Sequence, residues 1–113
     1  MNILLVDDDI DCLEALRRLV CMLGHSCAIA DDPRDAMAQY AQHAFDLVIT
    51  DFRMPAMDGS ELARKIRVVN PEAKIILLTG YATFGEMPGE SLFLAVIEKP
   101  VDVHELKDVL DKM

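Results

Sequence analysis

Hydrophobic residues gather in five short runs along the chain. The runs lie at residues 2–6, 26–30, 46–50, 74–78 and 94–97. In the third run, Leu47, Val48 and Ile49 follow one another without polar residues between them. A strand with this pattern is covered on both faces, which is typical of a parallel sheet enclosed by helices. The runs therefore predict five strands, of which 26–30 has the weakest pattern.

Between the runs, apolar residues recur every three or four positions, as on a helix with one buried face. This spacing predicts helices at 10–23 and 60–69, and two more that begin after Asp32 and Asp102. A further helical segment, the fourth in chain order, is expected between residues 83 and 92 and is predicted to be short or irregular. Alternating strands and helices predict an α/β fold with a doubly wound parallel sheet. The pattern leaves the strand order open.

Size and charge narrow the class of protein. The 113 residues, 52% of them hydrophobic and 27% charged, predict one folded domain over 1–113. The net charge of −9 argues against unaided binding to nucleic acid or anionic lipid. The first apolar run is too short for a signal peptide, and no run approaches membrane-spanning length. We therefore expect a cytoplasmic protein.

Cysteine and histidine add no recognisable site. The cysteines lack CxxC spacing, and we interpret them as buried free thiols: Cys12, Cys21 and Cys27. The histidines have no metal-ligand spacing, and we expect them on the surface or in loops: His25, His43 and His104.

Polar residues follow the apolar runs at their carboxyl ends. Asp7 and Asp8 follow the first run, Asp51 the third, Thr79 the fourth and Lys99 the fifth. The carboxyl ends of parallel strands form the edge where ligands bind, so we expect these side chains to meet. Three carboxylates in one cleft repel each other and suit a hard divalent cation, Mg²⁺ or Mn²⁺. Taken singly, each residue is equally well interpreted as a helix cap, a turn or a surface residue.

The same residues predict phosphoryl chemistry. Thr79 and Lys99 would offer a hydroxyl and an ammonium to a tetrahedral oxyanion. Beside a cation, the Asp51 carboxylate is equipped to attack phosphorus and form an acyl phosphate. The chain has no GxxxxGK[ST], GxGxxG or kinase signature. The phosphoryl group is therefore expected to arrive on a donor.

Four motifs resemble the receiver domain of bacterial two-component response regulators. LLVDDD, DLVITDFRMPAMDG, ILLTG and IEKP occur in the order of that family, and the match runs from residue 2 to the end of the chain. The resemblance implies a flavodoxin-like (βα)5 fold with strand order 2-1-3-4-5. It also implies a signalling domain that catalyses only its own phosphorylation and dephosphorylation.

The resemblance assigns a role to each residue of the predicted site. Asp51 would accept a phosphoryl group from a sensor histidine kinase or a phosphotransfer protein. Asp8, Asp51 and the backbone carbonyl of Arg53 would hold Mg²⁺, with Asp7 contributing through water. Thr79 and Lys99 would contact the phosphoryl oxygens, and the bond from Lys99 to Pro100 is expected to be cis. Phosphorylation would then switch a surface formed by the fourth helix, fifth strand and fifth helix.

Partners follow from the same resemblance. The kinase would meet five residues near the acceptor, namely Ile10, Cys12, Leu13, Pro100 and Val101. The signal would pass to an output domain or a downstream protein. We expect a monomer or a phosphorylation-linked dimer.

The chain departs from the family pattern in two places. Val96 stands three residues before Lys99, where the family usually has an aromatic residue. The segment between Thr79 and Lys99 is about two residues shorter than is common in the family, and it contains Gly85, Pro88 and Gly89. The acceptor chemistry is therefore expected to be intact and the output surface altered.

Two other functions are compatible with these residues. A degenerate receiver would act as a binding module without phosphorylation. The intact acids argue against it, and the two departures leave it open. An aspartyl-nucleophile phosphatase would normally carry a second acid two residues after the nucleophile, but that position is Arg53.

Overall fold

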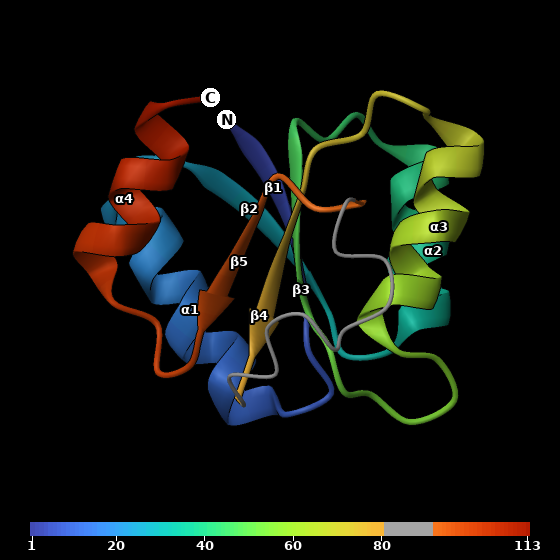
Figure 1. The fold of residues 1–113 in the computed structure, drawn as a ribbon, viewed down its shortest axis with the longest axis horizontal. Helices are drawn as coiled ribbons and strands as arrows, with labels where there is room; N and C mark the ends of the chain where they lie inside the picture. The colour runs from blue at the N-terminus through green and yellow to red at the C-terminus, as the bar shows by residue number, and fades with distance from the viewer. Residues whose placement is uncertain (81–91) are drawn as a thin grey trace.

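The computed structural model describes residues 1–80 and 92–113 (Figure 1). Its five strands form one parallel sheet in the order β2-β1-β3-β4-β5, which confirms the expected fold and strand order. The strands are β1 (Asn2–Val6), β2 (Ser26–Ala30), β3 (Leu47–Asp51), β4 (Ile75–Thr79) and β5 (Ala95–Glu98). The helices are α1 (Ile10–Met22), α2 (Pro33–Gln42), α3 (Gly59–Val69) and α4 (Val103–Asp111).

Two apolar cores separate the sheet from its helices. On one face, Ile3, Leu5 and Ile49 pack with residues of α1 and α4. On the other face, Leu4 and Val48 pack with residues of α2 and α3. Figure 1 shows these two pairs of helices on opposite sides of the sheet. Neighbouring residues of one strand thus enter different cores, which explains why the strand sequences are apolar without alternation.

Each of the four helices in the described part of the chain begins directly after an aspartate. The side chains of Asp9, Asp32, Asp58 and Asp102 accept hydrogen bonds from backbone N–H groups of the first turn that follows. These groups have no partner inside the helix, so an acceptor at this position stabilises the helix start. Pro33 lacks an N–H and occupies the first position of α2 without loss.

Three strands end one residue later than their apolar runs predict. Asp51 is the last residue of β3 and pairs with Leu78, and Thr79 is the last residue of β4 and pairs with Glu98. Backbone pairing with the neighbouring strand continues through these polar residues, because the hydrogen bonds do not depend on the side chain. Asp51 and Thr79 are therefore held by the sheet rather than by a loop.

The prediction of buried thiols is wrong for two of the three cysteines. Cys12 and Cys21 are exposed, and Cys27 is half-buried. On α1 the core-facing positions are Leu13, Leu16 and Val20, so the residues next to them turn away from the sheet. His43 and His104 are exposed as expected, while His25 is half-buried in the loop before β2.

The predicted helical segment at residues 83–92 falls largely outside the described residues, together with Gly85, Pro88 and Gly89. Among the helices that the structure does describe, none combines the length and the apolar character needed to cross a membrane.

Candidate functional site

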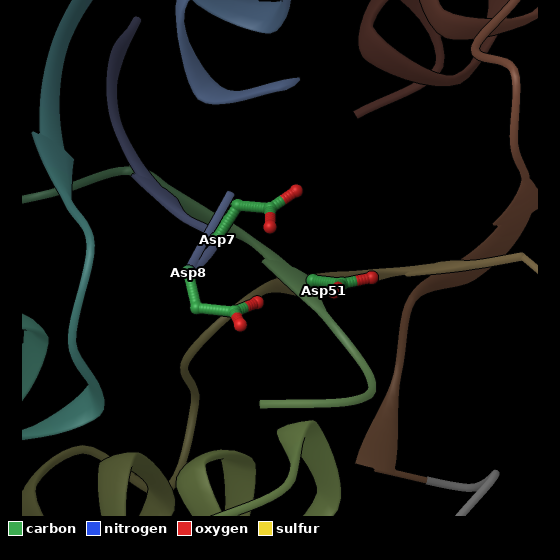
Figure 2. Close-up of side chains that lie close together, drawn as sticks. All are labelled: Asp7, Asp8 and Asp51. Carbon is green, nitrogen blue, oxygen red and sulfur yellow. The ribbon is translucent and has the colours of Figure 1, made fainter. Parts of the chain in front are cut away.

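Three carboxylates meet at the carboxyl ends of two adjacent strands. Asp7 and Asp8 follow β1, and Asp51 ends β3. One oxygen from each carboxylate lies within 4.8 Å of the others. Figure 2 shows the three side chains extending toward the same side from these strand ends. Asp7 and Asp51 are 2% and 9% exposed, whereas Asp8 is open to solvent. The sequence-predicted acids therefore do come together.

Lys99 joins two of these acids. Its Nζ lies 3.1 Å from Oδ2 of Asp7 and 3.1 Å from Oδ1 of Asp51. The backbone N–H of Lys99 donates to the carbonyl of Thr79 over 2.7 Å, which anchors the residue to the end of β4. Lys99 thus links the ends of three strands that are far apart in the sequence.

Burial and charge set the protonation of this cluster. Burial raises the pKa of Asp51, and the nearby charge of Asp7 raises it further, while the hydrogen bond from Lys99 opposes both. Burial alone would lower the pKa of Lys99, but its hydrogen bonds to Asp7 and Asp51 outweigh that effect and raise it. Lys99 therefore remains an ammonium and carries the positive charge that the two buried acids need.

A small pocket opens beside the acceptor carboxylate. It has a volume of about 160 Å³ and is lined by Asp51, Phe52, Arg53, Thr79, Gly80 and Lys99. Thr79 is 3% exposed and Arg53 is exposed. A carboxylate, a hydroxyl and an ammonium thus border one space that is accessible from the rim.

Close backbone packing fixes the end of β3. The N–H of Gly59 donates to the carbonyl of Phe52 over 2.7 Å. A Cβ atom at Gly59 would lie 2.6 Å from the carbonyl oxygen of Asp51 and 2.9 Å from a side-chain carbon of Leu77. Only glycine allows this approach. The hydrophobic pattern does not predict this contact, because it depends on where β3 and α3 lie relative to each other.

The remaining backbone features agree with the expectation or add to it. The bond between Lys99 and Pro100 is cis, as predicted. Ala56, in the loop after β3, has a φ of 71°, a left-handed conformation that a non-glycine residue seldom adopts. Val96 is half-buried on β5 and pairs with Leu77 of β4.

The donor set fits a hard divalent cation. Carboxylate oxygens are the ligands that Mg²⁺ prefers, and it usually binds through one or two carboxylates and several waters. Buried Asp7 and Asp51 and exposed Asp8 combine fixed oxygen donors with access for water. The residues present therefore suit Mg²⁺, in agreement with the chemistry expected from their spacing.

The residues expected to meet a kinase divide into two groups. Ile10, Cys12 and Pro100 are exposed, and Cys12 borders a 470 Å³ groove with Pro100 and Val101. Leu13 is 2% exposed and belongs to the core against α1. The expectation was wrong for Leu13, because the three- and four-residue spacing of α1 turns it toward the sheet.

Known proteins are similar to this chain in sequence and in fold. The family model for the response regulator receiver domain matches residues 3–111. Over 99% of its length the chain is 34% identical to the transcriptional regulatory protein ZraR of Salmonella typhimurium, of which it spans 26%. Over the same share it is 32% identical to the response regulator receiver protein CpdR of Brucella abortus, of which it spans 95%.

A solved structure adds a bound ligand set. The response regulator protein TrrA of Thermotoga maritima, in complex with Mg²⁺-BeF, is 32% identical and superposes with a TM-score of 0.91, covering 98% of this chain and 96% of that chain. Family match, identity and fold agree. The chain belongs to the response regulator receiver domain family.

Proposed function

We propose that the chain is a phosphoacceptor receiver, formed by residues 1–113 and acting in the cytoplasm. Asp51 accepts a phosphoryl group from a histidine of a sensor kinase or phosphotransfer protein. The observation that carries this proposal is the position of the Asp51 carboxylate: it is buried at a strand end, 3.1 Å from the Lys99 ammonium and grouped with Asp7 and Asp8.

The residues divide the chemistry between them. An oxygen of Asp51 attacks phosphorus, the phosphorus–nitrogen bond of phosphohistidine breaks, and the electron pair returns to the imidazole, leaving an acyl phosphate on Asp51. Lys99 and Thr79 donate hydrogen bonds to the phosphoryl oxygens. Asp8, Asp51 and the carbonyl of Arg53 would hold Mg²⁺, and Asp7 would contribute through water. When bound, the cation neutralises charge on the phosphoryl oxygens.

Transfer requires Lys99 to change partners. Its Nζ lies between Asp7 and Asp51, and the phosphoryl group brings new oxygens into the adjacent pocket. Lys99 then follows the added negative charge, and Thr79 is drawn inward. These two shifts bias the surface around β5 and α4. Val96 supplies no ring, so this coupling proceeds without a rotating aromatic residue at that position.

Partners meet the molecule near the acceptor. We propose that the kinase contacts Ile10, Cys12, Pro100 and Val101, where a groove borders α1. The phosphorylated receiver passes the signal to an attached output domain or to a downstream protein. The transcriptional regulator ZraR is much longer than this chain, which covers 26% of it, so an attached output domain is one form this output takes.

Capture of beryllofluoride with Mg²⁺ tests the proposal. The analogue mimics a phosphoryl group on a carboxylate, so the wild type is expected to bind one equivalent in the presence of Mg²⁺ and Asp51→Asn none. Isothermal titration measures both. Thermal unfolding of Asp51→Asn shows that the variant is folded. A wild-type protein that does not bind the analogue in Mg²⁺ contradicts the proposal.

The two competing functions give other results. A binding module would bind its partner equally well as wild type and as Asp51→Asn. A phosphatase would release many equivalents of phosphate from a phosphomonoester for each protein chain, whereas a receiver releases at most the phosphate that it first accepted. Arg53 stands where the phosphatase would need its general acid, which disfavours the enzyme.

A further inference from the structure

Two thiols lie in contact away from the acceptor site. The Sγ atoms of Cys21, in the last turn of α1, and Cys27, in β2, are 3.7 Å apart and share a hydrogen bond. Neither residue belongs to the carboxylate cluster or to the pocket beside Asp51. An α-helix rises about 1.5 Å per residue, so Cys21 lies about 18 Å along α1 from Asp9, the residue that caps its start. The pair is therefore a separate feature of the molecule.

The turn between α1 and β2 holds the two cysteines together. The N–H of Gly24 donates to the carbonyl of Cys21 over 3.0 Å, and the N–H of His25 donates to the carbonyl of Val20 over 3.2 Å. Gly24 has a φ of 91°, which closes the helix in the conformation that glycine favours. β2 then pairs with β1 along its whole length. The backbone on both sides of the pair is thus fixed, and the sulfur contact follows from it.

The two thiols have different surroundings. Cys21 is exposed, while Cys27 is half-buried against the core under α1 and α4. Burial and the hydrogen bond with Cys21 raise the pKa of Cys27 to about 11, although the positive charge of Arg17 opposes them. Cys27 therefore remains a thiol at neutral pH. Cys21 is open to a reagent in solution.

We propose that Cys21 and Cys27 form a redox modification site, a dithiol that a hydroperoxide converts into an intramolecular disulfide. Cys21 reacts first: its thiolate attacks one peroxide oxygen, the O–O bond breaks, and a sulfenic acid and water form. Cys27 then attacks the sulfenic sulfur, the S–O bond breaks, and a second water leaves. In sum, two thiols lose two hydrogens and two electrons, and hydrogen peroxide becomes two waters.

The geometry allows this closure with a small movement. A disulfide has a sulfur–sulfur distance of about 2.05 Å, so the two Sγ atoms must approach by roughly 1.7 Å. The exposed side chain of Cys21 supplies this movement by rotation about its Cα–Cβ bond. In a reducing compartment such a disulfide is transient, which is typical of a sensor rather than of a structural link.

Cys12 provides a matched control within the same chain. It is exposed on α1 like Cys21, but its Sγ lies 3.4 Å from a carboxylate oxygen of Asp9. Burial and the hydrogen bond to Asp9 raise its pKa. No thiol partner is recorded for Cys12 in the described residues. It should therefore stay reduced while the pair oxidises.

The test counts thiols on the whole protein. Reduced protein is treated with a small excess of hydrogen peroxide, and remaining thiols are alkylated under denaturing conditions and weighed by mass spectrometry. We expect three alkylated cysteines before treatment and one afterwards, with the loss of two hydrogens. Peptide mapping should show Cys12 alkylated and Cys21 linked to Cys27. Non-reducing electrophoresis should show a monomer, and dithiothreitol should restore three thiols.

Variants separate this site from ordinary oxidation. Cys12→Ser is expected to form the link at the wild-type rate, while Cys21→Ser and Cys27→Ser form none. Cys21 is exposed, so its serine variant should remain folded, as circular dichroism will show. Three thiols that survive the treatment, a bond that includes Cys12, or a bond between two chains would each overturn the proposal. These outcomes do not depend on phosphorylation of Asp51.

Discussion

Lys99 places its ammonium between two buried carboxylates. Its ammonium lies 3.1 Å from an oxygen of Asp7 and 3.1 Å from an oxygen of Asp51, and both of these acids are largely buried. Breaking a buried ion pair by removing one partner is costly, because the other charge stays in a poorly solvated place. Lys99 therefore stabilises the fold as well as contacting the phosphoryl group that we propose.

Lys99→Met should lower the free energy of unfolding by about 2 kcal/mol in metal-free buffer. The substitution keeps most of the apolar stem but leaves Asp7 and Asp51 facing each other without a cation. Urea unfolding measures the change. Lys107→Met is the control, since its ion pair with Asp111 is exposed to solvent, and such a pair adds little to stability. Equal effects of the two substitutions would contradict the account of the site.

Asp51 predicts a dependence of stability on pH. Its pKa is raised in the folded protein, so the ionised carboxylate destabilises the fold at neutral pH, and this cost vanishes as pH falls through the raised pKa toward the ordinary value of 3.8. In metal-free buffer, Asp51→Asn should therefore have a larger free energy of unfolding than wild type near neutral pH.

The difference in the free energy of unfolding between Asp51→Asn and wild type should narrow as the solution is acidified, because the wild-type carboxyl then takes up its proton. Urea unfolding of both proteins across the acidic range measures it, and the difference cancels the titration of groups that do not interact with Asp51. A gap that widens on acidification would show that the pKa of Asp51 is lowered rather than raised.

At the scale of elements, the ends of β3 and β4 fix the positions of Asp51 and Thr79. The apolar runs predicted both strands to within one residue, because a strand that is buried on both faces is an uninterrupted run of apolar residues. They did not predict that pairing continues through Asp51 and Thr79. Strand order came from the resemblance to a family, since the pairing of distant strands leaves no local signal.

Contacts between elements were also beyond the sequence pattern. The close approach of Gly59 to β3 and the meeting of Cys21 with Cys27 both depend on how a helix is set against a strand. The three acids were predicted as a group because each stands at a strand end. The bridging position of Lys99 between two of them became visible only in the structure.

Gly59→Ala should disturb the junction of β3 and α3. The added methyl group would lie 2.6 Å from the carbonyl oxygen of Asp51, so the backbone must shift, at a cost of about 2 kcal/mol. The shift should also weaken beryllofluoride binding, because it moves the acceptor. Gly80→Ala is the control for stability, as a Cβ there meets nothing within 4 Å among residues 1–80 and 92–113. A fully stable Gly59→Ala protein would show that the contact is not restrictive.

At the scale of the whole molecule, the sheet assembles a site from residues 7 to 99. β1, β3, β4 and β5 each deliver at least one of the five side chains to the same edge. The helices cover the two faces of the sheet (Figure 1). Folding therefore brings the acceptor, the other acids and the hydrogen-bond donors together. Of the three carboxylates, only that of Asp51 is expected to accept a phosphoryl group.

The most direct measurement locates the phosphoryl group. Protein is incubated with acetyl phosphate and Mg²⁺, the acyl phosphate is reduced with borohydride, which converts the modified aspartate into homoserine, and peptides are sequenced by mass spectrometry. The account predicts homoserine at position 51 and none in Asp51→Asn. Modification at Asp7 or Asp8 in the wild type, or no modification at all, would contradict it.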